Sequence, residues 1–179
     1  MNSSPNSPNE LVKECIFQAL IILMETKSFH HISVSEITRK AGVSRMAYYR
    51  NYNSKESIIS EYLDRLFGIY LEDVKDLTEM DTYLFAKQFF SYFKKEHVLI
   101  DSLIRSKISF LLLDRFDTYI QVIFNKVVQD EDLSKKQSRY MQYFFTGGLF
   151  KLLIEWVSSG MAESEEEMAQ LILDFKRHP

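Results

Sequence analysis

The stretch SVSEITRKAGVSRMAYYRNYNSK, residues 33–55, predicts two short helices separated by a tight turn. Ser33 stands three residues before Glu36, the spacing of a capping box, in which each side chain bonds the backbone amide of the other residue. A helix is therefore expected over about 33–40. Gly42 follows as the residue that can take the left-handed conformation in which many helices end.

Ser44 is suited to cap a second helix over about 45–50, so the segment has the pattern of a helix-turn-helix. Ile37, Val43 and Tyr48 can share a small core with the preceding helix. The side chains expected on the outer face of the second helix are Arg45, Met46, Ala47, Tyr49, Arg50 and Asn51.

Positive charge is concentrated around this motif. Residues 27–56 contain six lysines and arginines but two glutamates, a net charge of +4, whereas the whole chain has a net charge of −3. Such asymmetry is typical of a nucleic-acid-binding module attached to an acidic body. Charge alone fits a solvated basic surface equally well.

The remainder of the chain predicts an all-α fold. Prolines occur only at positions 5, 8 and 179, the chain has five glycines, and apolar residues recur at steps of three and four. About nine helices are expected, over approximately 10–26, 33–40, 45–50, 55–77, 82–95, 97–105, 107–129, 134–160 and 165–177.

Several classes of protein are disfavoured. The single cysteine, Cys15, excludes an internal disulfide framework, and the longest apolar runs, such as ALIILM (19–24), are too short to span a membrane. With a polar N-terminus that lacks signal-peptide features, a cytoplasmic protein is expected. The four histidines lack metal-ligand spacing and no phosphate loop or nucleophile elbow occurs, so we expect no enzyme activity, metal or cofactor.

Double-stranded DNA is the partner that the outer face of the second short helix favours. A major groove admits a helix, Arg45 can pair with guanine, and Met46 and Ala47 can touch a thymine methyl. Phosphates would be contacted by Ser33, Ser44, Tyr49, Arg50 and Lys55. The alternative is a helical hairpin whose tyrosines are core and whose arginines are solvated.

Residues 29–59, FHHISVSEITRKAGVSRMAYYRNYNSKESII, resemble the DNA-binding domain of TetR/AcrR-family transcriptional regulators. The similar features are Phe29, Ile32, Ile37, the turn at 41–44, Tyr49, Tyr52 and Lys55. The resemblance implies base-facing positions at Ser35, Arg45, Met46 and Ala47. It implies backbone-contacting positions at Ser33, Ser44, Tyr49, Arg50, Asn51 and Lys55. Met46, Asn51 and Tyr52 depart from the usual pattern, and the variant is similar to a subgroup labelled as regulators of dihydroxyacetone kinase.

The segment FFTGGLFKLLIEWVSSGMAESEEEMAQLI, residues 144–172, is similar to the closing segment of that family, which implies a homodimer. Gly147 and Gly148 destabilise a helix interior by roughly 1 kcal/mol each relative to alanine. A close approach of another helix is one reason to keep them, and a packing site within the chain is another. The interface positions implied are Phe144, Gly147, Gly148, Lys151, Leu152, Trp156, Met168 and Leu171.

The family plan also implies a small-molecule effector cavity among the central helices, although most aromatic residues there are expected to be core. The candidate lining residues are Phe67, Tyr70, Phe89, Phe93, Phe110 and Tyr119. The expected organisation is a disordered tail (1–8), a helix-turn-helix domain (9–54) and an effector-binding and dimerisation domain (55–179). The function implied is a homodimeric repressor that binds a palindromic operator and is released by an effector. The alternative is an activator or co-regulator that acts through a protein partner with no small-molecule ligand.

Overall fold

A computed structural model describes residues 7–77, 81–127 and 134–177 of the chain. Within these ranges it contains nine α-helices and one short 3-10 helix, as the sequence predicts for an all-α fold. The elements are α1 (Pro8–Met24), η1 (Phe29–His31), α2 (Val34–Ala41), α3 (Arg45–Asn51), α4 (Lys55–Asp73), α5 (Thr82–Lys95), α6 (His97–Arg105), α7 (Phe110–Val127), α8 (Lys135–Ser158) and α9 (Glu165–Arg177).

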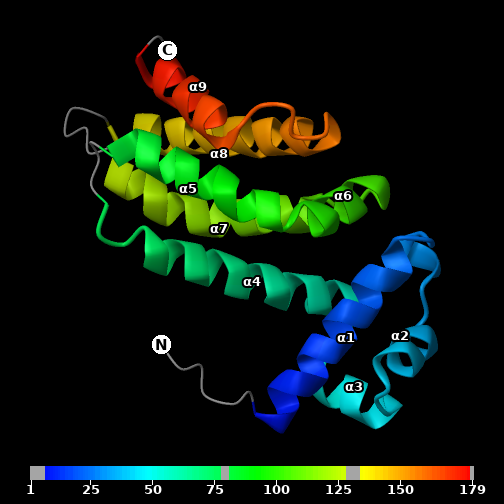
Figure 1. The fold of residues 1–179 in the computed structure, drawn as a ribbon. Coiled ribbons are helices and arrows are strands. Elements are labelled where there is room, and N and C mark those ends of the chain that lie inside the picture. The colour runs from blue at the N-terminus through cyan, green and yellow to red at the C-terminus, as the bar shows by residue number, and fades with distance from the viewer. Residues whose placement is uncertain (1–6, 78–80, 128–133, 178–179) are drawn as a thin grey trace.

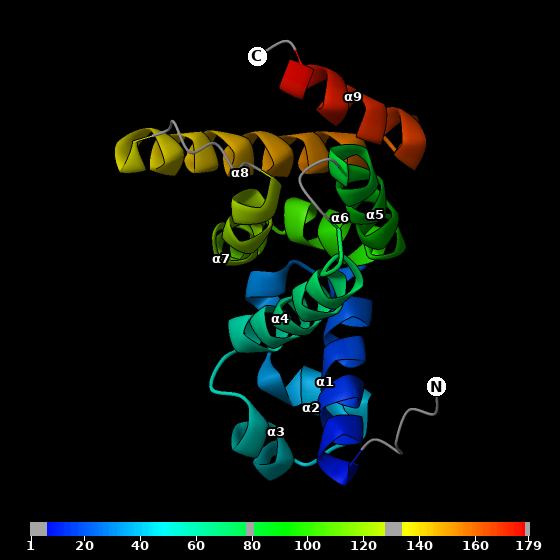
Figure 2. The same cartoon turned by 90° about the vertical axis from the view of Figure 1, so that its left-hand side faces the viewer.

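The first three helices form a head at one end of the molecule, and α4 leads from this head into the body (Figure 1). In the body, α4 packs on α7, α7 packs on α8, and α5 packs on α9. Figure 2 shows that the N-terminal part of α8 reaches beyond α7, away from the rest of the body. The predicted tail of residues 1–8 is shorter than expected, since Ser7 caps α1 and Pro8 is its first residue. Residues 1–6 lie outside the described part of the chain.

One continuous apolar core runs through head and body. In the head it contains Ile16, Leu20 and Ile37, which are fully buried. In the body, the ring of Phe116 lies 5.4 Å from that of Phe67 and 5.6 Å from that of Phe89, both edge to face. This aromatic packing holds α4, α5 and α7 together.

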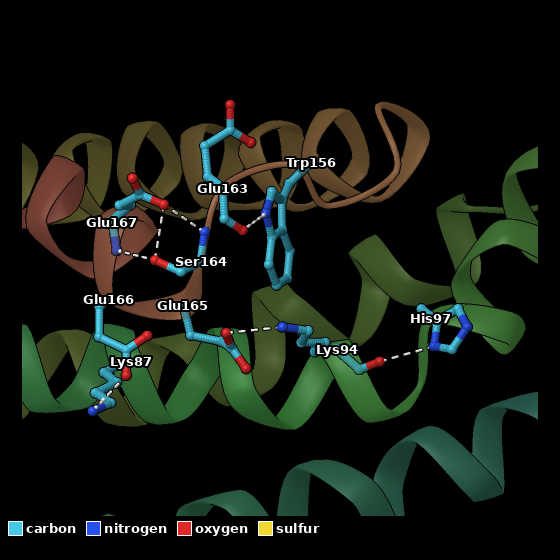
Figure 3. A network of polar contacts seen from close by, with 9 residues as sticks. All are labelled: Lys87, Lys94, His97, Trp156, Glu163, Ser164, Glu165, Glu166 and Glu167. Atoms are coloured by element: carbon cyan, nitrogen blue, oxygen red, sulfur yellow. Dashed lines mark hydrogen bonds and ion pairs between the residues drawn. The ribbon is translucent and has the colours of Figure 1, made fainter.

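Polar contacts hold α9 against α5 (Figure 3). The Nζ atoms of Lys87 and Lys94 lie 2.8 and 2.9 Å from carboxylate oxygens of Glu166 and Glu165. These lysines lower the pKa of both carboxyl groups. Just before α9, the indole of Trp156 donates a hydrogen bond of 3.0 Å to the carbonyl oxygen of Glu163. The start of α9 is thereby tied to both α5 and α8.

Two predicted helix boundaries differ from the structure by three residues or more. The fourth helix ends at Asp73 instead of about 77, because the backbone leaves the helical region at Val74, with φ −103° and ψ 6°. The seventh begins at Phe110 instead of about 107, because Lys107 has a positive φ of 59° and closes α6 with a left-handed turn. The predicted end of that helix near 129 lies outside the described residues.

Candidate nucleic-acid interface

The start of α2 is held by the predicted capping box. The amide of Glu36 donates to Ser33 Oγ at 3.3 Å, and the amide of Ser33 donates to Glu36 Oε2 at 2.9 Å. The second carboxylate oxygen of Glu36 accepts a 2.7 Å hydrogen bond from the Lys27 ammonium. This ion pair and the capping bonds lower the pKa of Glu36 to about 2.

The turn between α2 and α3 depends on Gly42, whose φ is +69°. The amide of the next residue, Val43, reaches back to the carbonyl oxygen of Thr38 at 3.0 Å and so closes α2. Ser44 then starts α3 by accepting a hydrogen bond of 3.0 Å from the Ala47 amide. The helix-turn-helix therefore forms where the sequence predicts it.

The two sides of α3 have opposite environments. Tyr48 is fully buried, and its ring meets those of Tyr49 and Tyr52 at centroid distances of 5.2 and 6.1 Å. The opposite side is open to solvent, with Met46 84% exposed and Tyr49 53% exposed. The predicted contact residues that are exposed are Ser33, Ser35, Ser44, Arg45, Met46, Tyr49 and Arg50. The hairpin alternative, in which the tyrosines are core, is wrong for Tyr49, and Tyr48 is a core residue in both interpretations.

Two predicted contact residues are only partly exposed. The Asn51 amide donates a 2.8 Å hydrogen bond to the carbonyl oxygen of Ala47, one turn earlier in α3. Ala47 itself is half-buried at the edge of the exposed face. Both residues lie at this face, but the Asn51 amide already has a partner within the protein.

Lys55, which the sequence predicts to contact a phosphate, forms hydrogen bonds within the protein. Its ammonium donates hydrogen bonds of 2.7 and 2.6 Å to the carbonyl oxygens of Phe29 and Ile32 and lies 4.6 Å from the centroid of the Phe29 ring. Desolvation lowers its pKa, and the carboxylates of Glu56 and Glu36 oppose this effect. The sequence analysis missed η1, and the carbonyl groups of Phe29 in η1 and of Ile32 just after it accept these hydrogen bonds.

The body contains an apolar cavity of about 30 Å³ lined by residues of α4, α5, α7, α8 and α9. Only Tyr70 and Phe89 of the predicted lining residues line it. The other lining residues are Thr82, Phe85, Ala86, Ile120, Ile123, Phe145, Leu149 and Ile172. The sequence analysis missed them because their spacing does not differ from that of ordinary core residues.

The remaining predicted cavity residues lie elsewhere. Phe67 and Tyr119 stack against each other at 5.1 Å, and Phe67 also meets the ring of Phe93, so these rings fill their space themselves. Phe110 is 52% exposed at the start of α7. Its assignment to the cavity is wrong, because the first residue of this helix faces solvent.

One side of α8 presents large apolar groups to solvent. Phe144 is 84% exposed and Tyr140, one turn earlier, is 55% exposed. Gly147, Gly148 and Lys151 follow on the same side at helical spacing and are also exposed. We call these five residues the α8 face. Its helical spacing was a signal that could have found Tyr140 from the sequence.

The α8 glycines are not required by packing within the chain. A Cβ atom added at Gly147 or Gly148 would meet no atom within 4 Å. The explanation by an intrachain packing site is therefore wrong for the described residues. On α9, Leu171 and Phe175 are exposed as well.

Two predicted interface residues are part of the protomer core instead. Trp156 is 2% exposed and its ring packs edge to face on Phe90, while Met168 is 3% exposed. These two assignments are wrong because both side chains are covered within the protomer. Leu152 is half-buried next to the α8 face.

The part of the chain that the structure describes shows no group of three or more histidine, cysteine or acidic side chains placed to hold a metal ion. Along the same residues, no helix has the length and apolar character needed to cross a membrane.

Comparisons with known proteins match both parts of the chain. Residues 16–62 match the family described as "Bacterial regulatory proteins, tetR family", and residues 80–177 match the family "Transcriptional regulator C-terminal region". A curated relative, the uncharacterized HTH-type transcriptional regulator YvdT of Bacillus subtilis (strain 168), is 24% identical over 131 residues. The match covers 73% of this chain and spans 60% of the length of that relative.

Two solved structures are similar in fold. Lin0861 from Listeria innocua has a TM-score of 0.76 and 18% identity, over 99% of this chain and 96% of that chain. The dihydroxyacetone kinase operon activator DhaS has a TM-score of 0.64 and 17% identity, over 92% of this chain and 93% of that chain.

Proposed function

Because this chain belongs to the TetR family of bacterial regulatory proteins and is a DNA-binding transcriptional regulator, we propose that it binds a palindromic operator as a homodimer. In this proposal it represses transcription in the cytoplasm until a small-molecule effector releases it. The helix-turn-helix domain comprises residues 9–54, and residues 55–179 form the effector-binding and dimerisation domain.

The observation that carries the proposal is the exposed outer face of α3. Arg45 and Met46 lie at its start, where they can reach base edges, and the Arg45 guanidinium lies 6.0 Å from the Tyr49 ring centroid. Tyr49 and Arg50 are exposed beside them and suited to phosphates. Ser35 and Ala47 complete the base-facing set, and Ser33, Ser44 and Asn51 complete the backbone-facing set.

In vitro selection of duplexes by the purified full chain tests DNA recognition. The expected result is an enriched palindrome whose half-sites are about 34–36 Å apart, or a multiple of that distance, to match a two-fold dimer. If repeated rounds at low salt enrich no duplex, specific DNA binding by this chain is refuted.

The α8 face supports a homodimer. A dimer that pairs α8 and α9 with their copies would cover Tyr140 and Phe144, which are 55% and 84% exposed in the protomer. It would also explain the open space above Gly147 and Gly148, since glycines permit the closest approach of a second helix. Lys151, Leu152 and Leu171 lie at the margin of this surface.

The cavity supports an apolar effector. Its lining is almost entirely aliphatic and aromatic. The hydroxyl of Tyr70, in α4, already donates a hydrogen bond of 3.0 Å to the carbonyl oxygen of Phe85. Typical ligand pockets measure about 300–1,000 Å³, so an effector would have to push the surrounding helices apart. This displacement would move α4, which carries Tyr70 into the cavity wall and begins in the DNA-binding head.

Such coupling between two sites typically changes affinity about 5–150-fold. A screen of apolar small molecules against the protein–operator complex tests this part of the proposal. Release of the operator within that range is expected from an effector, together with protection of the body helices from hydrogen exchange. A compound that binds the body and leaves operator affinity unchanged would contradict the coupling.

An activator or co-regulator without a small-molecule ligand is the second candidate. The small size of the cavity favours it, and one protein of similar fold, DhaS, is named an operon activator. Transcription in vitro from a template that carries the selected operator separates the two: a repressor lowers transcript yield, and an activator raises it.

A further inference from the structure

Met46 is the most exposed methionine among the described residues. It is the second residue of α3, and its side chain is 84% exposed. Among the other described methionines, Met24 and Met168 are buried, Met161 is half-buried and Met141 is 41% exposed. An oxidant in solution therefore reaches the Met46 sulfur more readily than that of any other described methionine.

The position of Met46 connects its chemistry to DNA. The helix α3 lies at the end of the molecule opposite α9 (Figure 1, Figure 2), and Met46 stands beside Arg45 on the outer face of this helix. The backbone of this turn is held by the 3.0 Å hydrogen bond from the Ala47 amide to Ser44 Oγ, and the Met46 side chain takes no part in the apolar core. A chemical change at the Met46 sulfur therefore alters the outer face of α3 without disturbing the fold.

The thioether of methionine reacts with oxidants that transfer an oxygen atom, such as hydrogen peroxide. A sulfur lone pair attacks one peroxide oxygen, the S–O bond forms as the O–O bond breaks, and the other oxygen leaves as water. The sulfur is oxidised by two electrons and the peroxide is reduced by two. The product, methionine sulfoxide, is polar, and methionine sulfoxide reductases return it to the thioether.

We propose that Met46 is a reversible oxidation site through which a peroxide lowers the affinity of this protein for its operator. The inference rests on the proposed contact between the outer face of α3 and base edges. The thioether of Met46 suits the methyl group of a thymine, whereas a sulfoxide places a hydrogen-bond acceptor against that methyl group. Burial of a polar group without a hydrogen-bond partner is unfavourable, so the oxidised protein binds more weakly.

The experiment uses the full chain with Cys15→Ser as the parent, because the exposed Cys15 thiol reacts with the same oxidants. The parent, Met46→Leu and Met141→Leu are treated with hydrogen peroxide, and peptide mass spectrometry follows oxygen addition at each methionine. Met141→Leu is the matched control, since Met141 is an exposed methionine of α8, outside the head. Near-UV circular dichroism checks that each treated protein is folded, and Met24 and Met168 should stay unmodified.

Met46 should be oxidised faster than Met141. The treated parent should bind the selected duplex about tenfold or more weakly than the untreated parent, the effect of losing one base contact. Met141→Leu should lose affinity to the same extent, whereas the affinity of Met46→Leu should be the same before and after treatment. Incubation with methionine sulfoxide reductases of both stereospecificities should restore the affinity of the parent.

Two results would overturn the inference. One is an equal loss of affinity in treated Met46→Leu, and the other is unchanged affinity in a parent whose Met46 is fully oxidised. Failure of the untreated parent to bind any duplex is a different result, because it refutes the proposed function and the inference together.

A second measurement needs no substitution at Met46. A saturating amount of the selected duplex should slow the oxidation of Met46 and leave the oxidation rate of Met141 unchanged, because only Met46 is covered by DNA. Equal rates of Met46 oxidation with and without the duplex would place its sulfur outside the interface and contradict the inference.

Discussion

Replacing Phe144 with serine should convert the proposed dimer to a monomer. The side chain is 84% exposed in the protomer, and an aromatic side chain offers roughly 200 Å² of surface, so about 170 Å² is available for burial. At about 25 cal/mol per Å², complete burial contributes about 4 kcal/mol in each protomer. If a partner covers half of this surface, the two copies in a symmetric dimer together contribute about 4 kcal/mol. The dimer dissociation constant should therefore rise about a thousandfold.

Sedimentation equilibrium over a range of protein concentrations measures this change directly. Phe110→Ser is the matched control, because Phe110 is also an exposed phenylalanine at 52% but lies at the start of α7, apart from the α8 face. The control should keep the dissociation constant of the parent. A Phe144→Ser protein that dimerises like the parent, or an equal loss in both variants, would refute the assignment of the α8 face as the dimer interface.

Further predictions concern the head and α4. Gly42→Ala should lower the free energy of unfolding by about 1–2 kcal/mol, because the φ angle of Gly42 is +69°. Gly68→Ala should raise it by about 0.5–1 kcal/mol, because Gly68 lies in a helix with open space around it. Urea titration measures both changes, and changes of the same sign would contradict the argument. Glu36→Gln should make the stability of the protein fall less on acidification. The pKa of Glu36 in the folded state is about 2, below the ordinary 4.5, so its carboxylate contributes stability above pH 4.5 that is lost as the pH falls towards 2. Thermal melts between these pH values check the sign. Arg45→Ala should relax sequence preference at one base pair, whereas Arg50→Ala should weaken binding to all duplexes and make the salt slope shallower; identical selection profiles for the two variants would contradict this division.

The parts of the head that sequence analysis predicted correctly depend on neighbours in the chain. The bonds between Ser33 and Glu36, and the left-handed turn at Gly42, involve residues at most a few positions apart. Local chemistry determines such features, so their residue types and spacing are sufficient to predict them.

Features that depend on distant residues were not predictable in the same way. The contacts of Lys55 involve carbonyl groups 23 and 26 residues earlier, and backbone groups leave no trace in the sequence. Similarly, helical periodicity places Trp156 on an apolar side of α8, but it does not tell whether α5 or a second protomer covers that side. Only the three-dimensional arrangement shows that Phe90 lies against the Trp156 ring.

The glycines of α8 show the opposite case, in which sequence raised a question that the fold could answer. Their cost in a helix interior was evident from the sequence, but two explanations remained open. Among the described residues, no atom lies within 4 Å of a Cβ atom added at Gly147 or Gly148, so packing within this part of the chain does not account for them, and the approach of a second helix stays a prediction.

The small size of the cavity in the body has a consequence for kinetics. A space of about 30 Å³ is far below the roughly 300–1,000 Å³ of typical ligand pockets, so the proposed effector would enter only when the helices separate. Its observed association rate would then rise with concentration only until it equals the rate of opening, and level off. At saturating concentrations of the proposed effector, the delay before operator release would be set by the rate at which the helices separate. It would not depend on the effector concentration.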